Sequence, residues 1–113
     1  MTPVCPVHHL TMSRYHTKYG PRFECPADGC DWYCWGGATS TPCNKELATL
    51  RHQCHEAFDP IWKREVDHRT KARARAYAWL ATLLGKTRRE AHIGMCNADE
   101  CRLILERVGE VKL

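Results

Sequence analysis

The sequence predicts an α+β fold in which a β-rich N-terminal unit, residues 1–43, is followed by a small bundle of three to four helices, residues 44–113. The first 43 residues are rich in Pro, Gly, Cys and aromatic side chains and lack helical periodicity. The remainder carries helix-capping residues and apolar positions at helical spacing. Because 113 residues can bury only a modest core, we expect the helices to pack on the N-terminal unit as one compact unit.

Residues 9–24 predict a β-hairpin. The segment "TMSRYHTKYGPRF" has strand-forming side chains on both sides of a turn signal, "YGP". The segments "RFEC" and "DWYCW" carry aromatic residues that favour strands, and "PADG" between them is typical of a turn. The N-terminal unit is therefore expected to consist of short strands and tight turns.

Two prolines indicate where helices begin. Thr41 is the expected N-cap of the first helix, with Pro42 at its first position, where the missing N–H is tolerated. Apolar or small residues then recur at helical spacing: Leu47, Leu50, Cys54 and Ala57. Asp59 is the expected N-cap of a new helix that begins at Pro60 and is interrupted around residues 67–70.

The C-terminal helices carry clearer end signals. Gly85 follows "YAWLATLL" and is a natural C-terminal stop. "TRRE" and "NADE" have the spacing of capping boxes, the second with Asn97 as the capping residue and Glu100 as its partner. The segment "AHIGMC" between them predicts a turn or short helix. The last helix has an apolar stripe: Cys101, Ile104, Leu105 and Val108.

Cysteine and histidine usage indicates metal binding. The chain has eight cysteines and seven histidines. Its N-terminus lacks the basic and apolar pattern of a secretory signal, and no apolar run approaches the roughly 18 residues of a membrane span. We therefore expect a cytoplasmic protein that binds no membrane. In that reducing compartment, clustered cysteines more often bind metal than form disulfides.

Four residues form two pairs with metal-ligand spacing. Cys5 and His8 give a C-x2-H pair, and Cys25 and Cys30 give a C-x4-C pair. The intervening hairpin would bring both pairs together, which is the plan of a zinc ribbon. Thiolate and imidazole ligands suit Zn²⁺ in a closed tetrahedral site. The sequence thus predicts one structural zinc ion bound by Cys5, His8, Cys25 and Cys30.

Alternatives to this ligand set remain open. His9 could replace His8, Cys34 could replace one cysteine of the second pair, or the thiols could be ordinary core residues. A closed site keeps no position for a catalytic water. Because Asp59 is better interpreted as an N-cap than as a catalytic acid, we expect no catalytic residues and no enzyme activity. A metal-dependent hydrolase using Glu56, Asp59 or Asp67 is the less favoured interpretation.

A second metal site is conceivable in the helical region. Its ligands would be His92, Cys96 and Cys101 together with Cys54 or His55, although this spacing matches no established pattern. The favoured interpretation is that Cys54 and Cys101 pack in the helical core. A Cys/His nucleophilic pair lacks an orienting acid and oxyanion donors.

Positive charge is concentrated in one segment. The net charge is +4, and the segment from Lys63 to Arg89 contains nine Lys or Arg residues but only two acidic residues. Such a segment is what phosphate contacts require, since counterion release grows with each neutralised phosphate. The candidate nucleic-acid-binding residues are Arg64, Arg69, Lys71, Arg73, Arg75, Arg88 and Arg89. The candidate base-stacking residues are Tyr15, Tyr19, Phe23, Trp32, Tyr33 and Trp35. Some of these aromatic side chains must instead cover the core of the ribbon. Trp62 and Trp79 are expected in the helical core.

The chain also resembles known families. "CPVH" with "GPRFECPADGC" resembles the zinc ribbons at the C-termini of type I DNA topoisomerases, with His8 replacing a cysteine. Nearly the full chain resembles a phage and prophage family of small zinc-finger-containing proteins of uncharacterised function. The segments that carry this second resemblance are "ELATLRHQCHEAFDPIW", "ARAYAWLATLLG" and "AHIGMCNADEC". It implies a phage-encoded, zinc-binding protein in the host cytoplasm and implies no particular activity.

The favoured hypothesis is a non-enzymatic zinc-ribbon protein that binds DNA or RNA through the basic helix and the ribbon aromatics. The alternative is a phage protein that binds and inhibits a host enzyme, such as a defence nuclease or the transcription machinery. No small-molecule substrate is expected under either hypothesis. The sequence does not distinguish DNA from RNA or identify the target.

Overall fold

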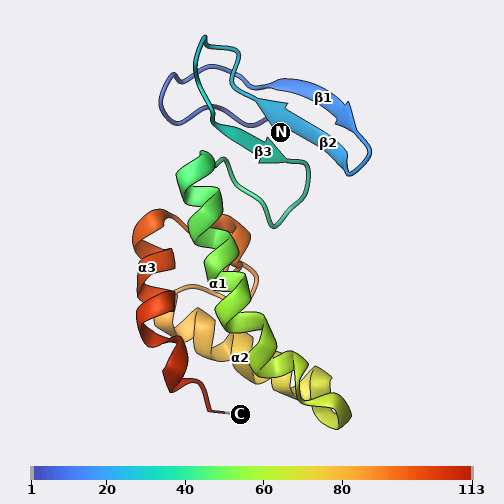
Figure 1. Ribbon diagram of the computed structural model, residues 1–113, viewed down its shortest axis with the longest axis vertical. Helices are drawn as coiled ribbons and strands as arrows, with labels where there is room; N and C mark the ends of the chain where they lie inside the picture. Colours follow the sequence, from blue (N-terminus) through green and yellow to red (C-terminus); the bar gives the residue numbers. More distant parts are fainter. Residues whose placement is uncertain (1, 113) are drawn as a thin grey trace. The chain divides into compact units, whose positions relative to one another are not determined.

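The computed structural model describes residues 2–112 and confirms the α+β class, with a three-stranded antiparallel sheet followed by three α-helices (Figure 1). The chain divides into two compact units, Met1–Ala48 and Thr49–Leu113. The predicted boundary after residue 43 precedes this division, which falls inside the first helix. Within residues 2–112, no helix combines the length and apolar character needed to cross a bilayer.

The sheet of the first unit has the order β1-β2-β3, with β1 at Ser13–Thr17, β2 at Gly20–Glu24 and β3 at Tyr33–Trp35. The predicted hairpin is confirmed, since β1 and β2 pair antiparallel from Ser13 opposite Glu24 to Thr17 opposite Gly20. Gly20 has a φ of +106°, which only glycine adopts readily. The Thr17 hydroxyl donates to the Gly20 carbonyl at 2.7 Å and closes the turn.

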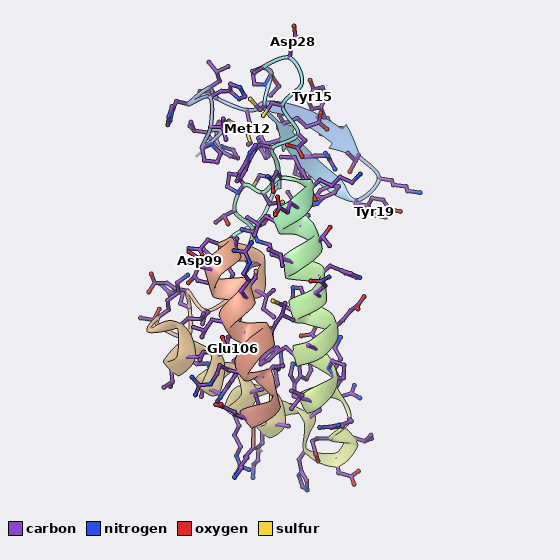
Figure 2. All side chains as sticks on the ribbon, turned by 60° about the vertical axis from the view of Figure 1, so that its left-hand side comes forward. Met12, Tyr15, Tyr19, Asp28, Asp99 and Glu106 are labelled. Atoms are coloured by element: carbon purple, nitrogen blue, oxygen red, sulfur yellow. The ribbon has the colours of Figure 1, made fainter. Side chains whose placement is uncertain are left out.

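The buried core of the first unit contains very little ordinary apolar material. Its main cluster has four buried members, Cys5, Met12, Cys25 and Cys34, with Phe23, Ala27, Cys30 and Trp32 packed against them. Cys43 and Leu47 are also buried in this unit. Figure 2 labels Met12 within this unit. Three of the four buried side chains in this cluster are therefore thiols, and packing alone provides little stabilisation.

Helix α1, Lys45–Lys63, begins later than predicted. The predicted cap at Thr41 with Pro42 is wrong, because Cys43 still pairs with Tyr33 in an isolated antiparallel bridge and the backbone there is extended. Asn44 serves as the cap instead, and its side-chain oxygen accepts from the Leu47 N–H at 2.8 Å.

The prediction that Asp59 caps a new helix at Pro60 is also wrong, because Pro60 lies inside α1. Asp59 accepts a hydrogen bond from His55 Nδ1 at 3.1 Å, one turn earlier in the same helix. The buried positions Arg51, Cys54 and Phe58 continue one helical stripe up to this point. Burial of that stripe favours an unbroken helix over the local preference for a start at proline.

The interruption predicted around residues 67–70 lies slightly earlier, at a turn followed by the 3₁₀ helix η1, Val66–His68. Helix α2, Arg69–Leu84, then ends as predicted at Gly85, whose φ is +65°. The Lys86 N–H donates to the Ala81 carbonyl at 3.0 Å, which completes the C-terminal cap.

The third helix, α3 at Ala98–Arg107, begins with the predicted capping box: Asn97 Oδ1 accepts from the Glu100 N–H at 2.8 Å, and Glu100 Oε1 accepts from the Asn97 N–H at 3.0 Å. The "TRRE" segment makes similar contacts, but residues 88–90 form only a turn, so no helix follows that box. The "AHIGMC" segment contains a short 3₁₀ helix, η2 at Ile93–Met95, and a further 3₁₀ turn, η3 at Val108–Glu110, follows α3.

The core of the helical unit centres on Phe58. Its ring packs edge-on against Tyr77 with centroids 5.2 Å apart and stacks on Trp79 with centroids 6.4 Å apart. The fully buried side chains of this unit include both predicted thiols: Cys54, Phe58, Leu80, Ile93, Cys96, Cys101 and Ile104.

We expect Asn97→Ala to lower the free energy of unfolding by about 1 kcal/mol, since it removes one half of the capping box and leaves the Glu100 N–H unpaired. Asp99→Ala, in the first turn of the same helix, is the matched control and should change it by only a few tenths of a kcal/mol, about the contribution of an exposed charge near a helix N-terminus. Chemical denaturation measures both, and equal effects would contradict the assignment of Asn97 as the cap.

Candidate metal centre and aromatic sheet face

The first ligand pair lies in a tight loop before β1. The Cys5 N–H donates to the Leu10 carbonyl and the Cys5 carbonyl accepts from the His9 N–H, both at 2.9 Å. His9 has a φ of +58°, the left-handed conformation that closes such a loop. These bonds fix Cys5 and direct His8 of the same turn toward the sulfur.

The second ligand pair lies in the loop between β2 and β3. The Cys25 N–H donates to the Trp32 carbonyl at 3.1 Å, and the Cys30 N–H donates to the Ala27 carbonyl at 3.2 Å. Gly29 has a φ of +76° and permits the sharp turn before Cys30. Asp28, at the exposed tip of this loop, is labelled in Figure 2.

The four predicted ligands converge. Their ligand atoms all lie within 4.8 Å of one another, and they are the only such group of three or more found among residues 2–112. Cys5 Sγ lies 3.7 Å from His8 Nδ1 and 3.8 Å from Cys30 Sγ, and Cys25 Sγ lies 3.6 Å from His8 Nδ1.

These distances match the edges of a zinc-centred tetrahedron. With Zn–S of about 2.3 Å and Zn–N of about 2.05 Å, tetrahedral geometry gives about 3.8 Å between two sulfurs and about 3.6 Å between sulfur and nitrogen. All eight cysteines are free. The cluster can therefore hold one tetrahedral ion through three thiolates and one imidazole, with no position left for a substrate.

Without a cation, the thiols of the cluster have very different pKa values. Burial raises the pKa of Cys5, but hydrogen bonds to its sulfur from the backbone and ring of His8 outweigh burial and lower the pKa to about 6. The Trp32 N–H lowers the pKa of Cys30, but burial and hydrogen bonding to the neighbouring thiols raise it to about 11. Neighbouring thiols oppose one another's ionisation, whereas a coordinated divalent ion lets all of them ionise.

The two alternative ligands lie outside the cluster. His9 contributes its backbone to the loop, and it is His8 whose ring reaches Cys5 and Cys25. Cys34 lies in β3, where its thiol donates to the Trp35 carbonyl at 3.3 Å. Of the predicted substitutes, neither joins the group of four.

The thiols of the helical unit are buried but do not form a comparable group within the described residues. Cys54 Sγ donates to the Cys101 carbonyl at 3.3 Å, and Cys96 Sγ donates to the His92 carbonyl at 3.4 Å. Burial raises the pKa of Cys96 to about 12. Arg51, also buried, donates from Nε to the Cys96 carbonyl at 2.9 Å. This arrangement agrees with thiols that serve as packing groups.

One face of the sheet carries aromatic side chains around an arginine. Tyr15, Arg22 and Trp35 are directly paired across the three strands, so their side chains share a face. Tyr33, two residues before Trp35 on β3, lies on the same face. The next row, Arg14, Phe23 and Cys34, points to the opposite face, where Phe23 packs on the cysteine core.

Arg22 organises this outer face. Its guanidinium lies 4.1 Å from the Tyr33 ring centroid and 5.3 Å from that of Trp35, and its Nε donates to Glu24 Oε2 at 2.8 Å. Tyr19 at the hairpin tip meets Trp35 edge-on with centroids 6.5 Å apart. Figure 2 shows Tyr15 and Tyr19 along the hairpin. Because Tyr15 is 51 % and Tyr19 76 % exposed, the face is open to a ligand.

The six candidate stacking residues thus divide between two roles. Phe23 and Trp32 pack against the cysteine core, whereas the four others lie on the outer face or at its hairpin tip: Tyr15, Tyr19, Tyr33 and Trp35. Sequence reasoning did not single out Arg22. The alternation of β2, in which Arg22 and Phe23 must point to opposite faces, is the signal that identifies it.

The seven candidate basic residues also differ in their surroundings. Arg69 donates to the Lys63 carbonyl at 2.9 Å and so caps the end of α1. Arg73 lies 4.5 Å from the Tyr77 ring centroid and 5.4 Å from that of Trp62. Both arginines therefore have structural contacts within the helical unit.

The remaining candidates are more available. Lys71 and Arg75, one turn apart on α2, line a hollow of about 300 Å³ together with His68, Ala72 and Glu65. Arg64 lies in the turn after α1, and Arg88 and Arg89 lie in the turn after α2. All five basic side chains are exposed. The structure thus brings Lys71 and Arg75 together and leaves the other three in separate turns.

We expect purified protein to hold one equivalent of zinc and Cys25→Ser to lose it, since the substitution removes one thiolate of a closed four-ligand site. Cys34→Ser is the matched control, because Cys34 is equally buried in the same unit but lies outside the cluster. Elemental analysis and the spectrum of the Co²⁺-substituted protein measure occupancy and geometry. Loss of the ion from Cys34→Ser with retention in Cys25→Ser would contradict the ligand set. Two zinc ions per unmodified chain would indicate that the thiols of the helical unit bind a second ion.

Residues 15–111 match the model of a family described as a zinc-finger-containing domain. No curated protein and no solved structure matches the chain. The matched region contains Cys25 and Cys30 and begins after Cys5 and His8. The match does not test a phage origin or a likeness to topoisomerase ribbons, which stay predictions. Because it covers most of the chain, this protein belongs to the family of zinc-finger-containing domains.

Proposed function

We propose that this protein is a zinc-dependent module that binds single-stranded nucleic acid on the outer face of its sheet. The ion is one structural Zn²⁺ held by Cys5, His8, Cys25 and Cys30, whose separations suit it. It would act by fixing the loops at both ends of the hairpin, and the chain would bind rather than catalyse.

The arrangement of aromatic rings around Arg22 carries the proposal. Bases of a single strand stack on exposed aromatic rings whatever their sequence. Arg22 stacks on Tyr33 and Trp35 and pairs with Glu24, so it holds these rings in place, and the more exposed rings of Tyr15 and Tyr19 are the ones offered to bases. Tyr15 and Trp35 lie on the two outer strands of the sheet, about 10 Å apart at the usual strand spacing, with Arg22 between them. A duplex, whose bases are already stacked, could not use this surface in the same way.

The basic residues of α2 are a second candidate contact with phosphates, argued from the helical unit by itself. Lys71 and Arg75 are the best placed, since both are exposed and share the same hollow. Arg73 is less suitable, because its guanidinium packs on Trp62 and Tyr77. Such contacts would be insensitive to sequence and sensitive to salt.

The rival hypothesis is inhibition of a host enzyme by protein–protein contact. The exposed apolar residues near the first ligand pair could serve such a contact: Val4, Val7 and Leu10. No feature of these three residues specifies a partner. The nucleic-acid hypothesis is preferred because the exposed rings of the sheet match the chemistry of bases and the exposed Lys71 and Arg75 match that of phosphates.

We expect Tyr15→Ala to weaken binding to a single-stranded homopolymer about tenfold, the effect of losing one stacking ring. His16→Ala is the matched control, since His16 is the next residue of β1, is exposed and points to the opposite face. Fluorescence anisotropy with labelled DNA and RNA oligomers measures both variants. Equal affinities for both variants and the unmodified chain would overturn the proposal, as would tighter binding to duplex than to single strands.

We expect the double variant Lys71→Gln, Arg75→Gln to reduce the slope of log K against log salt by roughly 1.4, about 0.7 for each phosphate contact to a single strand. Arg102→Gln, Lys112→Gln removes the same charge from exposed positions of the helical unit and serves as the control. Titrations at four salt concentrations give the slopes. An unchanged slope in the first variant would remove α2 from the interface while leaving the sheet face to be judged by Tyr15→Ala.

A further inference from the structure

Strand β1 is at one edge of the sheet and β3 is at the other (Figure 1). The β3 edge is partly covered, because Tyr33 and Cys43 exchange two backbone hydrogen bonds of 2.8 Å. Just before β1, the Met12 N–H donates to the Pro3 carbonyl at 2.9 Å, so an extended segment already pairs there. Along β1 itself, no described residue pairs on the side away from β2. An uncovered edge of this kind can pair with a further strand.

The hydrogen-bond pattern identifies which backbone groups face the open edge of β1. The first residue after β3 donates its N–H to the Pro21 carbonyl at 3.0 Å, so Pro21 faces β3 and its neighbour Arg22 faces β1. Arg22 pairs with Tyr15, whose backbone groups therefore face β2. By alternation, the N–H and carbonyl groups of Arg14 and His16 point to the open edge.

The open edge is also positively charged. Arg14 and Lys18 are exposed, β1 contains no acidic residue, and within residues 2–112 no ion pair involves either cation. Two copies pairing antiparallel about Tyr15 would place Arg14 of each copy opposite His16 of the other, with no acid to compensate. The edge therefore suits a strand of opposite charge better than a second copy of this chain.

We propose that β1 binds an extended acidic peptide as a fourth strand of the sheet. Antiparallel pairing, the more stable arrangement, would place two peptide residues directly opposite Arg14 and His16, where each can exchange two backbone hydrogen bonds. Acidic side chains at these positions would be attracted to Arg14 and Lys18, and a β-branched residue between them would pack on Tyr15. The ligand class is a segment in which two acidic residues flank one aliphatic residue. This partner is independent of the proposed nucleic acid.

The probe is a capped synthetic peptide, TVEVEVT, whose two glutamates can lie opposite Arg14 and His16. It is titrated into the zinc-loaded full chain without nucleic acid. At about ten times its Kd, hydrogen exchange of the Arg14 and His16 amides should slow about tenfold. Exchange of the Tyr15 amide, which faces β2, should change little. The charge-reversed peptide TVKVKVT should bind about tenfold more weakly.

A variant of β1 tests whether the contact is made by the backbone. His16→Pro removes one donor that faces the open edge and spares the hydrogen bonds to β2, since proline is tolerated on an edge strand in this orientation. His16→Ala keeps the donor and is the matched control. We expect His16→Pro to weaken peptide binding about tenfold and His16→Ala to keep most of the affinity. One equivalent of zinc and a dispersed amide spectrum identify the variants that are folded.

Methylated peptides give a second test that uses only the unmodified chain. In antiparallel pairing the glutamate N–H groups face β1, and the N–H of the valine between them faces away. Methylating a glutamate nitrogen should therefore weaken binding about tenfold, whereas methylating that valine nitrogen should leave it unchanged. Equal effects of the two methylations, or no binding of TVEVEVT at all, would overturn the proposal. A dimer of the free chain that His16→Pro dissociates, seen by sedimentation, would overturn it in favour of a second copy.

Discussion

The N-terminal unit depends on the convergence of Cys5, His8, Cys25 and Cys30. Among its described residues, Met12 and Leu47 are the only buried hydrophobic side chains that are not thiols, so packing gives little free energy to offset the conformational entropy lost in ordering two loops and a hairpin. A bound ion would supply this free energy directly, because the ligands become a site only when the loops fold. In this view the ion is a structural element and the chemistry of recognition lies elsewhere.

The sheet separates these two tasks by strand alternation. The row that contains Phe23 packs on the cysteine core, and the adjoining row that contains Arg22 points away from it. A one-residue slip of β2 would exchange the two faces and place Arg22 on the core. The loops that hold the four ligands therefore also fix the register on which the proposed recognition surface depends.

The features predictable from sequence were those encoded within a few residues. The ligand pairs, the hairpin with its glycine turn, the Gly85 stop and the Asn97 capping box each depend on a short pattern, and the structure contains them. The errors came from distant partners. Thr41 could not cap α1, because Cys43 pairs with Tyr33 across the sheet. Pro60 did not begin a helix, because the buried stripe through Phe58 favoured continuation. The role of Arg22 was hidden for the same reason, since its ring partners lie on another strand.

The most direct test of the central claim is the ¹H–¹⁵N correlation spectrum of the full chain before and after removal of zinc by a chelator. The account predicts that amide signals from residues 2–44 collapse toward unfolded positions, while those from residues 69–107, which include α2 and α3, keep their dispersion. Restoring one equivalent of zinc should restore the lost signals. A sheet that keeps its dispersed signals without the ion would contradict the claim that the four converging side chains hold this unit together.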